Sequence, residues 1–238
     1  KADIKKYFES IDHEILIKTI KKKIKDNRVL WLIRKILNNG GGRTTQGSEN
    51  RRFSGLSSQV QKGMPLGNLT SQFFANVFLN ELDQFVKHKL KVKYYIRYVD
   101  DFVILHKNKE TLQHYKKEIN NFLQTIKLEL HPDKSKIMAL NNGVTMLGYR
   151  VFYHHKLLRK SNLRKSQRKI KEKIELAKNN ILPYDSLLNS LTGWFGYAMW
   201  ANTYKLRKSL MKEIDSLFCN RIADKDIDRW LKIVEVQI

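Results

Sequence analysis

Two adjacent carboxylates, Asp100 and Asp101, interrupt a run of apolar and β-favouring residues, and this pattern constrains the fold more than any other feature of the chain. Residues 94–98 precede the pair and residues 102–105 follow it. Aromatic and β-branched residues favour strands and aspartate favours turns, so the pattern predicts strand, tight turn, strand. Both carboxylates would then lie at the turn and reach solvent. An ordinary hairpin explains them equally well, since aspartate is a common turn residue.

A carboxylate pair exposed at a turn also suits a divalent metal ion. Mg²⁺ prefers oxygen ligands, and nucleotidyl transfer uses two such ions about 4 Å apart to hold the attacking and leaving oxygens. A third carboxylate, Asp3, follows a short strand-like start and would complete a two-metal site if it lies beside the hairpin. Taken alone, Asp3 is equally well explained as a surface or helix-capping residue.

The charge of the chain favours a polyanionic partner. Among 238 residues, 46 are Lys or Arg and 23 are Asp or Glu, which gives a formal net charge of +23. Phosphate neutralisation drives non-specific nucleic-acid binding, so RNA or DNA is the leading candidate and an anionic membrane surface the alternative. A lysine bias of the source proteome explains the charge without any partner. The content of 42% hydrophobic residues and only 3 prolines excludes disordered and fibrous classes.

The single cysteine, Cys219, excludes an internal disulfide framework and suits a reducing compartment. No apolar run approaches the roughly 20 residues that a membrane span needs. The sequence also shows no secretory signal. It opens at Lys1 without an initiator Met, inside what reads as a structured element, so we expect an upstream portion to be absent.

Apolar residues recur at helical spacing along much of the chain and alternate in a few short stretches. Helices are expected at 13–37 (two, broken near Asp26), 72–90, 110–126, 163–180, 184–200 and 204–218, a short strand at 127–130 and a hairpin at 144–158. A glycine-rich polar loop insertion is expected at about 40–58. These patterns predict an α+β part at 1–158 and a helical part at 159–238.

A run of basic residues opens the helical part. The run extends from Lys156 to Lys173 and includes Arg164, Lys165, Arg168 and Lys169, and as a whole it is spread over too many helix faces to be paired internally. Such a run suits a phosphate backbone. A solvated helix face is the alternative explanation.

Several sequence blocks, taken in order, resemble the palm of reverse transcriptases. They are residues 1–13, 63–72, 98–101, 132–134 and 147–149, and the match continues over 194–206. Five ordered blocks at the expected spacing argue against a chance match, which a single block does not. The resemblance implies a polymerase palm, an antiparallel sheet with helices on one face, followed by an α-helical thumb. It also implies an RNA-directed DNA polymerase, a nucleotidyltransferase acting on template RNA, primer or cDNA, and deoxynucleotide triphosphates.

The resemblance assigns the catalytic centre to three aspartates and a lysine. Asp3 and Asp100 would bind two Mg²⁺ ions, with Mn²⁺ as an alternative, while Asp101 would be a weaker third carboxylate and the carbonyl of Ile4 a further oxygen ligand. Lys134 matches the lysine that would protonate the pyrophosphate leaving group.

The resemblance also assigns substrate contacts. Phe8 matches an aromatic steric gate that excludes a ribose 2′-hydroxyl, although a core phenylalanine is the alternative. Leu66, Gly67, Gln72 and Tyr98 would complete the substrate-binding surface.

The hairpin predicted at 144–158 has a counterpart in the family as well. Gly148 and Tyr149 resemble the hairpin that grips the primer terminus, with the glycine allowing close backbone approach; a bulge in a plain hairpin is the alternative.

Two positions indicate which subtype of reverse transcriptase this chain resembles. Most reverse transcriptases carry Gln where this chain has Leu66 and Pro where it has Gln72, and this chain is similar here to the enzymes of diversity-generating retroelements. That subtype implies error-prone copying of template adenines, a small basic accessory protein, and a cytoplasmic, prokaryotic or phage-encoded enzyme with no membrane attachment. Losing the Gln amide removes a hydrogen-bonding group that could check substrate geometry.

Other readings stay open. Another bacterial retroelement or group II intron-like reverse transcriptase fits most of the blocks. An RNA-dependent RNA polymerase shares the palm, although Phe8 argues against it. A maturase-like RNA-binding scaffold is the non-enzyme alternative, although it has no need for three close carboxylates. The family's fingers lie upstream of Asp3, so we expect this chain to lack them and not to be a competent polymerase alone.

Overall fold

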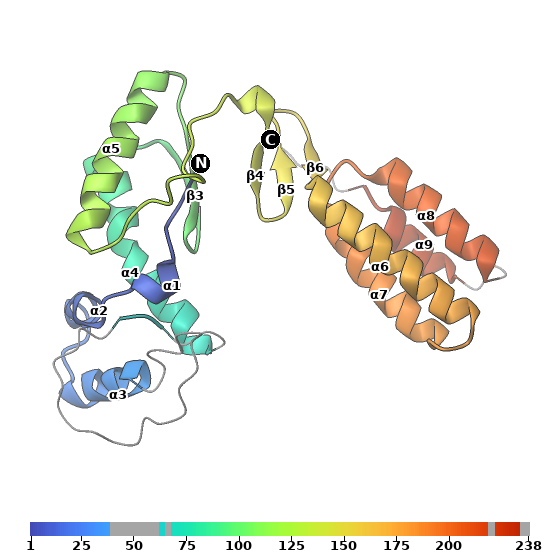
Figure 1. The fold of residues 1–238 in the computed structure, drawn as a ribbon, viewed down its shortest axis with the longest axis horizontal. Coiled ribbons are helices and arrows are strands. Elements are labelled where there is room, and N and C mark those ends of the chain that lie inside the picture. The colour runs from blue at the N-terminus through green and yellow to red at the C-terminus, as the bar shows by residue number, and fades with distance from the viewer. Residues whose placement is uncertain (39–61, 65–67, 219–221, 234–238) are drawn as a thin grey trace. The chain divides into compact units, whose positions relative to one another are not determined.

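The computed structural model describes residues 1–38, 62–64, 68–218 and 222–233 and divides into two compact units, Lys1–Met138 and Ala139–Ile238 (Figure 1). The expected loop insertion at 40–58, Leu66, Gly67 and Cys219 lie outside the described residues. Among the described residues, no helix combines the length and apolarity needed to cross a membrane.

The first unit contains a three-stranded antiparallel sheet. Its strands are β1 (Ala2–Asp3), β2 (Tyr94–Tyr98) and β3 (Asp101–Leu105), in the order β1-β3-β2. The predicted strand, turn, strand around the aspartates is confirmed. The turn itself consists of Val99 and Asp100, so Asp101 is the first residue of β3 rather than part of the turn.

Most helices of the first unit follow the predicted periodicity, and the exception is the four-residue helix Tyr7–Ser10, which was not predicted. The helices are α1 (Tyr7–Ser10), α2 (His13–Lys21), α3 (Asn27–Asn38), α4 (Leu69–Gln84), which continues as a π-helical turn at Phe85–Lys89, and α5 (Lys109–Thr125). The side chain of Asp12 accepts hydrogen bonds from the first free amides of α2, which explains why that helix begins there. The predicted strand at 127–130 is wrong: a single bridge between Leu130 and Ile4 takes its place.

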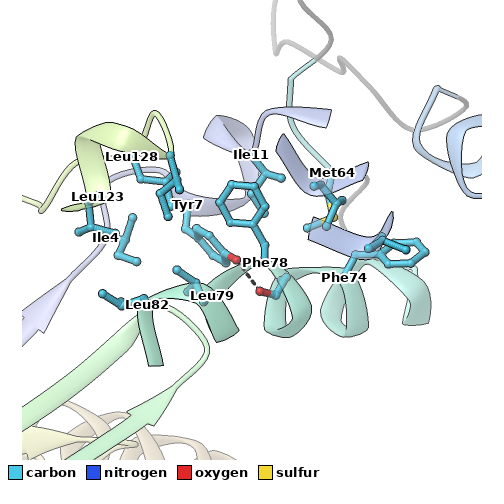
Figure 2. Packing of buried hydrophobic residues seen from close by; sticks show 14 of the residues in the cluster. Ile4, Tyr7, Ile11, Met64, Phe74, Phe78, Leu79, Leu82, Leu123 and Leu128 are labelled. Atoms are coloured by element: carbon cyan, nitrogen blue, oxygen red, sulfur yellow. Dashed lines mark hydrogen bonds between the residues drawn. The ribbon is translucent and has the colours of Figure 1, made fainter. Parts of the chain in front are cut away.

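The core of the first unit fixes the chain that follows Asp3. Ile4 and Tyr7 are buried against Leu79 and Leu82 of α4 and against Leu123 of α5 (Figure 2). The Tyr7 hydroxyl also donates to the carbonyl of α4 residue Ala75 at 2.6 Å. Full burial of such side chains stabilises a fold by about 1.5–3 kcal/mol each. The backbone that follows Asp3 is therefore held by packing.

The sheet of the first unit has one covered and one exposed face. Tyr95 and Arg97 of β2 point toward α4 and bind its side chains, whereas the alternating residues Tyr94, Ile96 and Tyr98 are more than half exposed. Strand residues alternate between faces, so these two sets of side chains project to opposite sides of the sheet. The predicted α+β class is confirmed.

The second unit begins with its own antiparallel sheet, β4 (Val144–Met146), β5 (Tyr149–Val151) and β6 (Lys156–Leu158), in the order β4-β5-β6. The helices that follow in the described residues are α6 (Lys160–Lys178), α7 (Tyr184–Ala198), α8 (Tyr204–Leu217) and α9 (Asp224–Leu231). Their core includes Leu187, Leu191 and Phe195, whose ring stacks on Trp230 at 4.6 Å. The sheet β4-β5-β6 belongs to the same compact unit as the helices that follow it. The domain boundary that the sequence pattern places after residue 158 stays a prediction.

Candidate active site

Sheet register brings the three predicted carboxylates to one end of the first sheet. Asp3 of β1 lies directly opposite Asp101 of β3. The amide of Ile4 donates to the carbonyl of Asp100 at 3.3 Å, which ties β1 to the hairpin turn. Directly opposed residues in an antiparallel pair project from the same face with Cβ atoms about 4.5–5.5 Å apart. Asp3 and Asp101 therefore share one face beside Asp100.

The carboxylates repel one another. Partial burial raises the pKa of Asp100, and the negative charges of Asp3 and Asp101 raise it further, while Lys134 opposes the shift. One oxygen of Asp101, Oδ1, is buried and has no hydrogen-bond partner in the part of the chain that the structure describes. An unsatisfied buried carboxylate oxygen is costly, so it is a position where a cation is expected.

Two lysines partly neutralise this charge. The Nζ of Lys134 lies 2.9 Å from Oδ2 of Asp3, and the Nζ of Lys1 lies 2.8 Å from Oδ2 of Asp101. The hydrogen bond from Lys134 to Asp3 raises the pKa of that lysine, so its ammonium group stays protonated at neutral pH. A protonated lysine beside carboxylates is in the state that a general acid requires.

The donor set fits a hard divalent cation. All three side chains offer carboxylate oxygens, the ligands that Mg²⁺ prefers, and one of these oxygens is Oδ1 of Asp101, which has no partner among the described residues. Within the described ranges, however, no group of three or more His, Cys, Asp or Glu side chains is already gathered closely enough to hold one ion. The three aspartates fit the ion because they offer oxygen ligands and lie at the same end of the sheet. The ammonium groups of Lys134 and Lys1 lie beside Asp3 and Asp101.

A serine that the sequence patterns did not indicate explains how Lys134 reaches Asp3. Ser135 is buried, and its hydroxyl both accepts from the amide of Asp3 and donates to its carbonyl, each at 3.2 Å. The amide of His131 donates to the same carbonyl at 2.7 Å. Lys116 of α5 holds the segment from the other side by donating to the carbonyl of Ser135 at 2.8 Å.

Phe8 lies in α1, five residues after Asp3, and is half-buried against the core. Its ring meets that of Tyr7 edge-on at 5.4 Å. The backbone of the block that begins at Gly63 is fixed against it, because the amide of Met64 donates to the carbonyl of Phe8 at 2.7 Å. Gly63 has φ +88, and a Cβ there would lie 3.3 Å from the carbonyl oxygen of Glu9, which explains the glycine.

Two other predicted substrate residues, Gln72 and Tyr98, are not part of the packing around Phe8. Gln72 lies in the first turn of α4 and is exposed, and Tyr98, at the end of β2, is also largely exposed. Tyr98 lies directly opposite Asp101 in the hairpin, so its backbone is part of the carboxylate end of the sheet.

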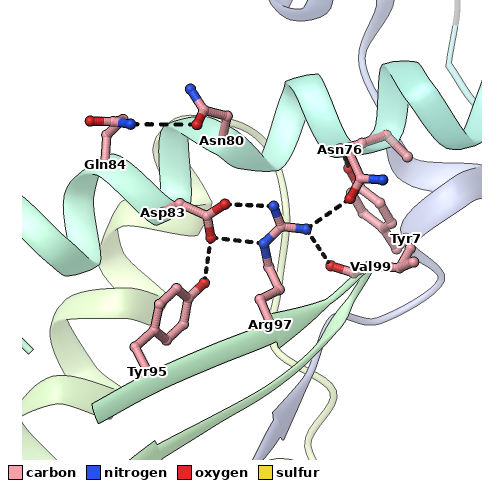
Figure 3. A network of polar contacts seen from close by, with 9 residues as sticks. Tyr7, Asn76, Asn80, Asp83, Gln84, Tyr95, Arg97 and Val99 are labelled. Atoms are coloured by element: carbon pink, nitrogen blue, oxygen red, sulfur yellow. Dashed lines mark hydrogen bonds and ion pairs between the residues drawn. The ribbon is translucent and has the colours of Figure 1, made fainter. Parts of the chain in front are cut away.

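A polar network between the hairpin and α4 was not predicted from the sequence. Arg97 donates from Nε and Nη2 to the two oxygens of Asp83 at 2.8 and 2.6 Å, and from Nη1 to the carbonyl of Val99 at 2.9 Å and to Asn76 at 3.2 Å (Figure 3). Tyr95 donates to Asp83 at 2.7 Å. A sequence signal existed: an arginine on the helix-facing side of a strand needs a buried acceptor.

Gly148 and Tyr149 are locked to a helix of the second unit. The hydroxyl of Tyr149 donates to the carbonyl of Tyr197 at 2.8 Å, and the hydroxyl of Tyr197 donates to the carbonyl of Gly148 at 3.0 Å. Burial raises the pKa of Tyr149 to about 12, so its phenol stays a donor. Gly148 has φ +85, and a Cβ there would overlap the Tyr197 hydroxyl. Both residues thus have a structural role, whatever they contact in a complex.

The basic residues predicted to contact nucleic acid lie on the exposed side of α6. Arg164, Lys165, Arg168 and Lys169 are all exposed, whereas the opposite side of the helix buries Ile170, Ile174 and Ala177. Arg168 pairs with Glu172 at 3.5 Å, but both side chains are largely in solvent, where such a pair contributes little. The face therefore carries an excess of positive charge.

An antiparallel sheet that gathers three aspartates and a protonated lysine at one end is typical of metal-dependent nucleotidyltransferases. Residues 1–151 match the family described as reverse transcriptase (RNA-dependent DNA polymerase), and the chain belongs to this family.

Three curated proteins illustrate the relationship. Protein YkfC of Escherichia coli strain K12 is 26% identical over 183 residues, which cover 63% of this chain and 45% of YkfC. The group II intron-encoded protein LtrA of Lactococcus lactis subsp. cremoris is 28% identical over 211 residues, covering 62% of this chain and 34% of LtrA. An uncharacterized 91 kDa protein in the cob intron of Schizosaccharomyces pombe is 39% identical over 87 residues, covering 37% of this chain and 10% of that protein. The chain spans less than half the length of each.

Proposed function

We propose that this chain carries the catalytic centre of an RNA-directed DNA polymerase. The observation that carries the proposal is the register of Asp3 opposite Asp101, with Asp100 joined to the same strand ends, in a member of the reverse transcriptase family. In the reaction, a primer 3′-hydroxyl attacks the α-phosphorus of a deoxynucleotide triphosphate paired with template RNA. A new P–O bond forms as the bond to pyrophosphate breaks.

Asp3, Asp100 and Asp101, with the carbonyl of Ile4, would hold two Mg²⁺ or Mn²⁺ ions. When bound, these ions act as Lewis acids on the phosphoryl oxygens and lower the pKa of the primer hydroxyl. Support comes from Oδ1 of Asp101, which has no hydrogen-bond partner among the described residues, and from the partial burial and the neighbouring carboxylates that raise the pKa of Asp100.

Lys134 would protonate the departing pyrophosphate. Its raised pKa keeps the proton available at neutral pH, and its side chain is 61% exposed on the solvent side of Asp3. To donate, the ammonium group leaves Asp3, whose carboxylate then becomes free for other ligands. General acid catalysis of this kind contributes about 10²-fold or more.

Phe8 would exclude the 2′-hydroxyl of ribonucleotides, and Leu66, Gly67, Gln72 and Tyr98 would line the nucleotide and primer. The fixed backbone of α1 against Met64 supports a rigid wall at Phe8. The primer end and the duplex would be held by Gly148, Tyr149 and the basic face of α6 at Arg164, Lys165, Arg168 and Lys169. In this account, residues 1–158 form the palm and 159–238 the thumb.

For the subtype, Leu66 and Gln72 favour a diversity-generating retroelement, with error-prone copying of adenines and a small basic accessory protein. A group II intron-type enzyme is the second candidate, because one relative, LtrA, is a group II intron-encoded protein. Misincorporation opposite template adenine separates the two. If Leu66→Gln leaves the misincorporation rate unchanged, the diversity-generating assignment fails.

The proposed activity is tested by extending a DNA primer on an RNA template with Mg²⁺ and the full-length protein that contains these residues. We expect deoxynucleotides to be used in preference to ribonucleotides, and Asp100→Asn to abolish extension while RNA affinity is retained. Preferred use of ribonucleotides would instead indicate an RNA polymerase. RNA binding without extension in the unsubstituted protein would indicate a scaffold.

A further inference from the structure

The hairpin turn that carries Asp100 has an unfavourable backbone conformation. Val99 has φ +54, in the left-handed region that β-branched residues rarely adopt. Such conformations cost of order 1–3 kcal/mol and persist only where surrounding contacts hold them. The turn therefore depends on external contacts to keep its shape.

Arg97 supplies those contacts from the helix side. One nitrogen, Nη1, donates to the carbonyl of Val99 at 2.9 Å, while Nε and Nη2 form a two-bond fork to Asp83 of α4. Asn76, also on α4, accepts from Nη1 at 3.2 Å. Asn76 and Asp83 are seven residues apart, which places them on the same side of the helix two turns from one another.

The Arg97 and Asp83 pair is strongly oriented. The two side chains are only 10% and 22% exposed, so the pair is shielded from screening by solvent. Tyr95 donates a further bond to Asp83, which fixes the carboxylate from another direction. Bidentate arginine–carboxylate pairs add geometric specificity to their energy.

We propose that Arg97, oriented by Asp83, is a positioning residue that holds the Val99–Asp100 turn and so sets the place of the Asp100 carboxylate. The turn is held from two sides: by Arg97 on the side of α4, and by the amide of Ile4 on the side of β1, which donates to the carbonyl of Asp100. Loss of the hydrogen bond from Arg97 to the Val99 carbonyl would let the strained turn relax. This inference rests on the proposed function for its catalytic consequence only.

Lysine cannot replace arginine here. The four bonds use three nitrogens of one planar group, which spans a carboxylate, an amide oxygen and a backbone carbonyl. A lysine ammonium keeps the charge but donates from a single point. Arg97→Lys therefore separates the geometry of the fork from its charge.

The test compares Arg97→Lys and Asp83→Asn with the unsubstituted full chain. Glu81→Gln serves as the matched control, because Glu81 lies on the same helix and pairs with Lys22 at 2.7 Å without contacting the turn. Binding of Mn²⁺ is measured from the loss of the free-ion signal in electron paramagnetic resonance. Primer extension gives kcat and the KM for primer–template, and thermal unfolding reports folding.

We expect both variants to bind Mn²⁺ about 10-fold more weakly and to lose about 10- to 100-fold in kcat with little change in KM, since small misplacements of catalytic groups cost this much. Glu81→Gln should match the unsubstituted protein. Equal Mn²⁺ affinity and equal kcat in Arg97→Lys would overturn the inference, as would equal losses in Glu81→Gln.

Outcomes that bear on the proposed function stay separate. If the unsubstituted protein binds Mn²⁺ but does not extend primers, the proposed polymerase activity fails, while the comparison of Mn²⁺ affinities still decides the role of Arg97. If Arg97→Lys does not fold, Asn76→Ala and Tyr95→Phe, which each remove one bond of the network, take its place. The same weakening of Mn²⁺ binding, smaller in size, is expected for both, and its absence contradicts the inference.

Discussion

Lys134 donates a hydrogen bond from Nζ to Oδ2 of Asp3 at 2.9 Å, although 131 positions separate the two residues. Ser135 secures this approach by bonding both backbone polar groups of Asp3. The protonated ammonium group of Lys134 therefore lies beside the Asp3 carboxylate. In the proposed reaction, it moves from Asp3 to the pyrophosphate.

Lys134→Ala should lower the single-turnover rate of primer extension about 10²-fold, because the leaving group loses its proton donor. Lys134→Arg should be nearly as slow, since arginine keeps the charge but does not release its proton at neutral pH. The control is Lys5→Ala, which removes an exposed pair with Glu129 at 3.4 Å. A Lys134→Ala enzyme as fast as Lys5→Ala contradicts the role.

Asp100→Asn should stabilise the protein at neutral pH while it removes activity. Burial and neighbouring carboxylates raise the pKa of Asp100, so its protonated form is favoured on folding. The stability that the protonated carboxyl contributes is complete below its pKa in the unfolded chain, near 4. It is lost as the pH rises through the higher pKa of the folded state. Ionised Asp100 therefore costs stability at pH 7. We expect Asp100→Asn to melt about 2 °C higher at pH 7.

The pH series supplies the control for that prediction. The difference in melting temperature should shrink as the pH is lowered toward 4, because Asp100 then becomes protonated in both states. Asp133→Asn, a change at an exposed site one position from Lys134, is measured over the same pH range as the matched substitution. A difference that stays constant from pH 4 to 7 would show that ionisation is not the cause.

Gly148→Ala should destabilise the second unit by about 1–3 kcal/mol, because a Cβ there meets the Tyr197 hydroxyl in a backbone with φ +85. Tyr197→Phe removes that hydroxyl and its hydrogen bond to the Gly148 carbonyl. In the double variant, part of the Gly148→Ala loss should disappear, since the clash is relieved while the strain remains. Denaturant unfolding measures the cycle, and strictly additive losses would argue against direct contact.

Phe8→Val should relax the choice of sugar. The ratio of kcat/KM for ribonucleotides to that for deoxynucleotides should rise about 10-fold or more, because the 2′-hydroxyl no longer meets the ring. Phe8 also packs on the core, so the variant should lose about 1–2 kcal/mol of stability. Tyr7→Phe, which keeps the ring and loses the bond to Ala75, controls for that loss. An unchanged ratio would leave Phe8 as a core residue only.

The carboxylate hairpin could be predicted from the sequence because its signals are local. Apolar, β-favouring runs on either side of adjacent aspartates predict strand and turn within a dozen positions. The residue pattern left it open whether Asp3 lies beside that hairpin, and the resemblance to a family predicted that it does. Register between β1 and β3 joins segments about a hundred residues apart, and no periodicity reports it.

Other features escaped for physical reasons. Ser135 acts through its hydroxyl on a backbone far away in the sequence, and serine in a polar segment gives no signal of burial. The expected strand at 127–130 reduces to one bridge because β1 is only two residues long. Helix α9 was missed because five of its eight residues are charged, and only Trp230 is buried in the core.

The most direct test of a shared catalytic centre is a double-mutant cycle between Asp3 and Asp101 in single-turnover primer extension. The account predicts that Asp3→Asn and Asp101→Asn each slow extension severely and that Asp3→Asn has the larger effect. The double variant should be no slower than Asp3→Asn alone, because both residues act on one site. If either variant extends at the unsubstituted rate, or if the two losses multiply, these carboxylates do not form one centre.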